Sequence, residues 1–138
     1  MAITPYLYYQ DLEGALKFLS SAFGFRKHGQ AMSGPDGKLN HAAMKLGDDV
    51  IMMGRPSGKY RNPKQLKEAT QSLYVNVENV DRCFRRAKKA GARILEEPVD
   101  TEYGHRRFGA EDPEGHQWYF AQDIGKPARK RAAETKSK

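Results

Sequence analysis

The sequence has little cysteine, no long hydrophobic run and no excess of acidic residues. One cysteine among 138 residues excludes a disulfide framework and a cysteine-rich zinc site. No run of ten consecutive apolar residues exists, so no membrane-spanning segment is expected. The first residues lack the basic-then-apolar layout of a secretion signal, so a cytoplasmic location is expected. The composition, with 38% hydrophobic and 10% aromatic residues, is that of a globular chain.

The net charge of +7 is concentrated at one end of the chain. Residues 126–138 hold six basic residues and one acid, whereas residues 1–125 hold 18 basic and 16 acidic residues. A basic C-terminal tail is typical of a solvated extension, and the other interpretation is contact with nucleic acid. No aromatic residue in the tail is available to stack on a base, so a nucleic-acid partner is not favoured.

The chain repeats one pattern after 68 residues. Apolar residues with helical spacing follow Asp11 and precede Gly24, and the same spacing follows Asn79 and precedes Gly91. Asp and Asn are preferred N-caps, and Gly commonly ends a helix. Two helices, each entered from a short strand, are therefore predicted.

The second half of each repeat predicts further strands. Each half contains a hairpin with turn-forming residues, Gly47-Asp48-Asp49 in the first and Asp112-Pro113-Glu114-Gly115 in the second. Segments 25–31 and 92–99 each supply one more strand, so each repeat reads as a βαβββ module. The predicted organisation is a first module over 1–54, a linker over 55–69, a second module over 70–125 and the basic tail over 126–138.

This arrangement resembles the vicinal-oxygen-chelate superfamily, which includes glyoxalases, extradiol dioxygenases, and fosfomycin- and bleomycin-resistance proteins. The likeness covers about residues 3–123 and rests on segments that include Pro5–Leu7, Ala22–Phe25, His41–Asp48, Tyr103–Arg107 and Asp112–Trp118. The resemblance implies an α+β fold in which tandem βαβββ modules form a cleft of curved sheet with helices outside. It also implies a small organic ligand and a homodimer whose clefts are completed across the subunit interface.

Strand alternation predicts which side chains face that cleft. An aliphatic face should pack under each helix, while a mixed, tyrosine-rich face should be open. The candidate ligand-binding residues are Tyr6, Tyr8, His41, Met52, Ser72, Tyr74, Arg106, Phe108 and Tyr119. Trp118 and Phe120 are expected on the helix side.

The resemblance also implies where metal ligands would stand. Metal-dependent members of the superfamily place His and Glu ligands on the first and last strands of each module. The corresponding residues here are Thr4, Met52, Ser72 and Tyr119, none of which is a His or a carboxylate. Such side chains are poor ligands for the zinc, nickel, iron or manganese that the superfamily uses. No metal and no other cofactor are therefore expected.

Two of these candidate residues, His41 and Arg106, have alternative interpretations. His41 is the candidate catalytic base because its side chain titrates near neutral pH, or it only hydrogen-bonds a ligand or lies at the rim. Arg106 either clamps a ligand carboxylate or phosphate, or forms a salt bridge with Glu102, Asp112 or another nearby acid.

Two main hypotheses for function follow. The first is a metal-free protein that binds a small organic molecule in an aromatic-lined cleft, as in sequestration or antibiotic resistance. The second is a glyoxalase-like lyase or isomerase, or a dioxygenase-family enzyme, with a displaced metal site or with His41 as the general base. The sequence leaves open whether the protein is an enzyme.

Overall fold

The two long helices begin and end where the sequence predicts. In the computed structural model, which describes residues 1–125, α1 spans Leu12–Phe23 and α3 spans Val80–Lys89. The Asp11 side chain accepts a hydrogen bond from the backbone N–H of Gly14, and Gly24 ends α1 with a φ of 81°. The Asn79 side chain caps α3 in the same way. The predicted N-caps are confirmed, and they satisfy backbone donors that have no partner inside a helix.

Within residues 1–125, nine strands form two curved, open sheets. The first contains β1 (Tyr6–Tyr8), β2 (Arg26–Lys27), β3 (Met32–Ser33), β4 (Leu39–Leu46) and β5 (Asp49–Gly54). The second contains β6 (Ser72–Asn76), β7 (Arg93–Asp100), β8 (His105–Glu111) and β9 (Gln117–Asp123).

Strand order is the same in both sheets. The first sheet has the order β1-β5-β4-β2, with β3 also beside β4, and the second has the order β6-β9-β8-β7. In each sheet the first strand pairs in parallel with the last, β1 with β5 and β6 with β9. The tandem βαβββ arrangement expected from the repeat is therefore present.

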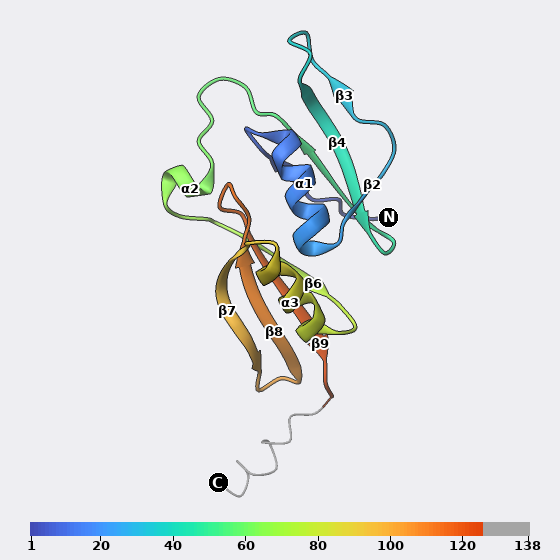
Figure 1. Ribbon diagram of the computed structural model, residues 1–138, viewed down its shortest axis with the longest axis vertical. Coiled ribbons are helices and arrows are strands. Elements are labelled where there is room, and N and C mark those ends of the chain that lie inside the picture. The colour runs from blue at the N-terminus through green and yellow to red at the C-terminus, as the bar shows by residue number, and fades with distance from the viewer. Residues whose placement is uncertain (126–138) are drawn as a thin grey trace, which may run out of the picture.

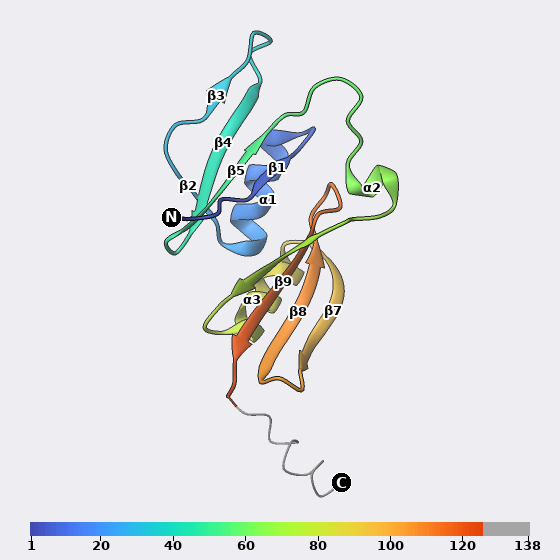
Figure 2. The same cartoon turned by 180° about the vertical axis from the view of Figure 1, so that it is seen from behind.

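The two long helices, α1 and α3, lie together on one side of the sheets, and the other side is open (Figures 1 and 2). The core fills the layer between the helices and the sheets. Phe23, at the end of α1, packs against Trp118 and Phe120 of β9, with ring centroids 5.4 and 4.8 Å apart. Because these three rings come from both repeats, one apolar core joins the two halves of the chain.

Two segments differ in detail from the prediction. Residues 25–31 were expected to supply one strand, but two very short and exposed strands, β2 and β3, lie in and just after this segment. The linker holds a single helical turn, α2 (Pro63–Leu66), which has a capping box formed by Asn62 and Gln65. A capping box gives a short turn local stability without apolar burial, and the apolar patterns sought in the sequence do not detect it.

No helix among residues 1–125 is long and apolar enough to cross a membrane. The basic tail over 126–138 lies outside the described residues.

Candidate functional site

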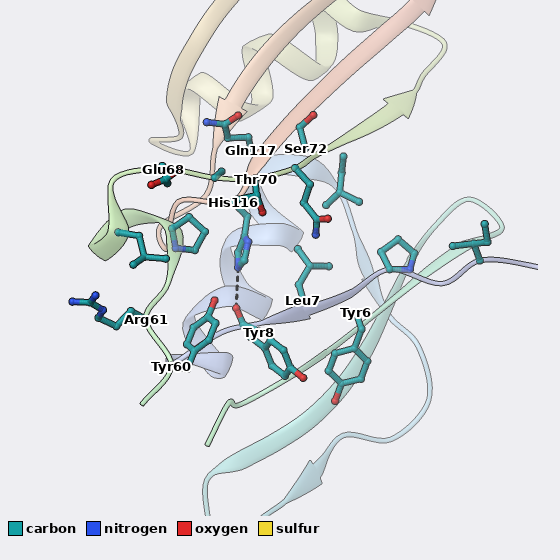
Figure 3. Close-up of a pocket in the computed structure, with 17 residues that line it drawn as sticks. Tyr6, Leu7, Tyr8, Tyr60, Arg61, Glu68, Thr70, Ser72, His116 and Gln117 are labelled. Atoms are coloured by element: carbon teal, nitrogen blue, oxygen red, sulfur yellow. Dashed lines mark hydrogen bonds between the residues drawn. The ribbon is translucent and has the colours of Figure 1, made fainter. Parts of the chain in front are cut away.

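A cleft with a volume of about 810 Å³ lies where the two halves of the chain meet. Its walls are β1, the start of β6, the linker that contains α2, and the turn between β8 and β9 (Figure 3). We call it the junction cleft. Tyr6, Tyr8 and Tyr60 supply aromatic surface, while Leu7 and Leu73 supply aliphatic surface. The volume is within the range of about 300–1,000 Å³ that holds drug-sized molecules.

Aromatic rings continue from the linker onto the open face of the first sheet. The ring of Tyr60 lies 5.6 Å from that of Tyr8, which lies 5.7 Å from that of Tyr6. The Tyr6 hydroxyl is 3.2 Å from Nδ1 of His41 on β4. Tyr6 stands beside Met52 in the β1–β5 register, so Met52 shares this face. The predicted residues of the first module therefore lie together, at or beside the cleft.

The second sheet contributes a similar open face. Ser72 lines the junction cleft, and Tyr74 stands beside Tyr119 in the β6–β9 register. The Tyr74 hydroxyl is 2.8 Å from Nδ1 of His105. The guanidinium carbon of Arg107 lies 5.7 Å from the centre of the Tyr119 ring. His105 and Arg107 were not among the predicted site residues.

The orientation predicted for Arg106 and Phe108 is wrong. Phe108 is fully buried and stacks on Phe120, with ring centroids 5.2 Å apart, so it belongs to the core. Arg106 forms salt bridges with Asp81 of α3 and with Asp100, at 3.2 and 2.9 Å. The salt-bridge interpretation of Arg106 therefore holds, with different acids from the two named in the sequence.

The error comes from one residue in the turn. A four-residue turn over 112–115 would place Phe108 opposite Tyr119. His116 is part of the turn instead, so the register pairs Glu111 with Gln117 and Phe108 with Phe120. A shift of one residue moves a whole strand's side chains to the other face. Aromatic side chains often stand opposite each other on neighbouring strands, so a register that pairs Phe108 with Phe120 could have been favoured from the sequence.

The turn between β8 and β9 belongs to the segment Asp112–Trp118, which is the motif that resembles the superfamily. This turn connects the two halves of the chain. Asp112 is buried and accepts four hydrogen bonds: from the Tyr9 hydroxyl at 2.6 Å, from Nε1 of Trp118 at 3.1 Å, and from the backbone N–H groups of Glu114 and His116. Tyr9 belongs to the first repeat and the other partners belong to the second. A single carboxylate therefore ties the two halves together.

Glu114 extends this connection to α1 and to the linker. Its carboxylate accepts hydrogen bonds at 2.8 Å from the backbone N–H groups of Gln10 and Asp11 at the start of α1. It also accepts one at 3.3 Å from the Asn62 side chain, which caps α2. A carboxylate is favourable at a helix N-terminus because the peptide dipoles point their positive ends there. The motif therefore positions two walls of the junction cleft.

The protonation states of several groups near the cleft follow from burial. Burial, followed by the charge of Asp112, raises the pKa of Tyr9 well above its usual value. Burial, followed by the charge of Glu114, raises the pKa of Tyr60. Burial also raises the pKa of Asp112, although the hydrogen bond from Tyr9 opposes this shift. Tyr9 and Tyr60 are therefore neutral hydroxyl donors at neutral pH.

His116 has a defined tautomer when it is neutral. Its Nε2 lies 2.8 Å from the backbone carbonyl oxygen of Tyr8 (Figure 3). A carbonyl oxygen only accepts hydrogen bonds, so Nε2 carries the proton and Nδ1 is an acceptor in the neutral ring. His116 lines the junction cleft and contributes a polar group to its inner wall.

The tandem βαβββ modules form a fold of the glyoxalase type. A family model for the Glyoxalase/Bleomycin resistance protein/Dioxygenase superfamily matches residues 3–120, so the chain belongs to this superfamily. An uncharacterised protein of Mycobacterium bovis is 32% identical over 128 residues, covering 89% of this chain and 84% of the relative. An uncharacterised protein of Mycobacterium tuberculosis is also 32% identical over 128 residues, and this match covers 89% of this chain and 75% of the relative.

Solved structures show the same architecture. TioX from Micromonospora sp. ML1 has a TM-score of 0.71 and 27% identity, covering 93% of this chain and all of the other. The fosfomycin resistance protein FosX from Mesorhizobium loti has a TM-score of 0.63 and 15% identity, covering 96% of this chain and 98% of the other. The likeness to FosX shows the fold alone.

The residues at the family's metal positions do not fit a divalent ion. Thr4 and Ser72 offer hydroxyl groups, Met52 a thioether and Tyr119 a phenol, and these are weak ligands for a transition metal. Within residues 1–125, no three His, Cys, Asp or Glu side chains come together as a group that could hold a metal.

Proposed function

We propose that the protein binds a small organic molecule in the junction cleft and sequesters it, without a metal. The observation that carries this proposal is the cleft itself, which has about 810 Å³ of space and walls from four parts of the chain. Tyrosine rings bind flat or amphipathic molecules because they offer large apolar surface together with a hydroxyl group. Tyr6, Tyr8 and Ser72, predicted from the sequence as ligand-binding residues, support the proposal because they line the cleft.

The neutral fluorescent probe N-phenyl-1-naphthylamine tests this proposal. We expect saturable binding with one probe per chain, and a loss of at least about tenfold in affinity in the double variant Tyr8→Ala/Tyr60→Ala, because two aromatic walls are removed. The matched control is Tyr103→Ala, which removes an exposed tyrosine outside the cleft and should change the affinity less than about twofold. A fluorescence titration gives all three affinities. The proposal fails if the unmodified protein shows no saturable binding, or if the control loses as much affinity as the double variant.

We also propose that the protein is a homodimer in which a second copy covers the open faces of the sheets. Tyr6 and Tyr74 are 47% and 43% exposed there, and large exposed apolar surface of this kind is typical of interfaces. Sedimentation velocity should give twice the chain mass of 15.6 kDa at micromolar concentration. A single species at the mass of one chain at every concentration would exclude the dimer.

A further inference from the structure

The linker has a net positive charge, whereas the rest of residues 1–125 has a small net negative charge. Residues 55–69 hold five basic residues and one acid, whereas the rest of 1–125 holds 13 basic and 15 acidic residues. Arg55 forms a salt bridge with Asp36 at 2.9 Å. Lys59, Arg61, Lys64 and Lys67 take part in none of the salt bridges formed within residues 1–125.

These charges belong to the segment that forms one wall of the junction cleft. Tyr60, Arg61, Pro63 and Leu66 line the cleft, so the basic residues are lining residues or their chain neighbours. Figure 3 shows the guanidinium of Arg61 pointing outward from the linker, away from the other lining side chains, so its charge acts on the cleft through solvent. A cleft bordered by charges of one sign concentrates ions of the opposite sign.

The acids around the cleft offset this charge only in part. Glu68 is the one acid that lines the cleft among the described residues. Asp112 and Glu114 are buried behind the wall, and their negative charges act on Tyr60 at the cleft. The four linker cations outside salt bridges therefore exceed the three acids Glu68, Asp112 and Glu114 by one. The apolar part of the lining includes Leu7 and Leu73. Figure 3 shows Leu7 apart from Arg61, with the rings of Tyr60 and His116 between them.

We infer that the ligand of the junction cleft is an organic anion with an apolar body, and this inference rests on the function proposed above. The apolar body lies between the tyrosine rings and the leucine side chains. The anionic group faces the linker, whose cations attract it through solvent. His116 contributes a polar contact to the inner wall, through Nδ1 as an acceptor in the neutral ring or as a donor in the protonated ring.

A matched pair of probes separates charge from shape. 8-Anilino-1-naphthalenesulfonate has the ring system of N-phenyl-1-naphthylamine and one added sulfonate. At about 10 mM salt, where screening is weak, the sulfonate probe should bind about tenfold more tightly than the neutral probe. The variant Lys59→Gln/Arg61→Gln/Lys64→Gln/Lys67→Gln should reduce this ratio to less than about twofold, while the affinity for the neutral probe stays within twofold.

The control removes the same number of charges from another surface. The variant Arg82→Gln/Arg85→Gln/Lys88→Gln/Lys89→Gln neutralises four exposed residues of α3, which do not line the cleft, and should leave the ratio unchanged. A ratio near one in the unmodified protein, or an equal fall in the control, would overturn the inference while the neutral probe still supports ligand binding. Loss of saturable binding for both probes would overturn the proposed function as well.

Discussion

Replacing Asp112 with alanine is expected to lower the free energy of unfolding by about 3–5 kcal/mol. The substitution removes the acceptor of four hydrogen bonds and leaves their donors without a partner in a buried site. An unpaired buried donor costs about 1–3 kcal/mol. The total for four donors is reduced because the turn rearranges and gives some of them new partners. Chemical denaturation followed by tryptophan fluorescence measures the change, because Trp118 is itself one of the donors.

Two further variants make the Asp112 experiment decisive. Asp112→Asn retains one carbonyl oxygen for the backbone donors but turns an amide N–H toward the Trp118 indole N–H, so an intermediate loss of stability is expected. Asp36→Ala removes an exposed salt bridge to Arg55 and should cost less than about 1 kcal/mol. Equal losses for Asp112→Ala and Asp36→Ala would show that the turn does not hold the two halves together.

Replacing Phe108 with alanine is the second substitution with a large expected effect. The side chain is fully buried, stacks on Phe120 and meets Phe84 of α3 edge to face. Its truncation leaves a cavity between sheet and helix, and buried Phe-to-Ala changes cost about 3–5 kcal/mol. Urea unfolding provides the free energy. Probe binding should be unchanged under conditions where the variant is folded, because the side chain lies on the helix side of β8.

The control for Phe108 is Tyr74→Ala. Tyr74 is half-exposed on the opposite face of the second sheet, and its truncation should cost less than about 1 kcal/mol. If Phe108 lay on the open face of the sheet instead, its removal would change stability as little as that of Tyr74. The two variants therefore test the register of β8 directly.

The sequence was most informative where local chemistry determines structure. Asp11 and Asn79 cap α1 and α3 as predicted, because a capping side chain and the first turn of a helix lie within a few residues of each other. The two helices with similar apolar faces, repeated within similar sets of strands, were sufficient to indicate a tandem fold. The match of the superfamily model to residues 3–120 confirms the family resemblance.

The sequence was least informative where one residue decides register or where loops meet. His116 lies in the turn rather than in β9, and this single residue moves Phe108 into the core and brings Arg107 to the open face. Tyr60 lies in a linker with no strong apolar pattern, and its position depends on the contact between Asn62 and Glu114, which are 52 residues apart. Such contacts depend on tertiary structure and leave no local pattern to detect.

A crystal structure of the protein grown with N-phenyl-1-naphthylamine tests the central claim most directly. We predict density for one probe per chain in the junction cleft. The probe should have the rings of Tyr8 and Tyr60 on one side and the side chains of Leu7 and Leu73 on the other. Density for the probe only elsewhere on the molecule would contradict the account, as would a junction cleft filled by a segment of a second copy.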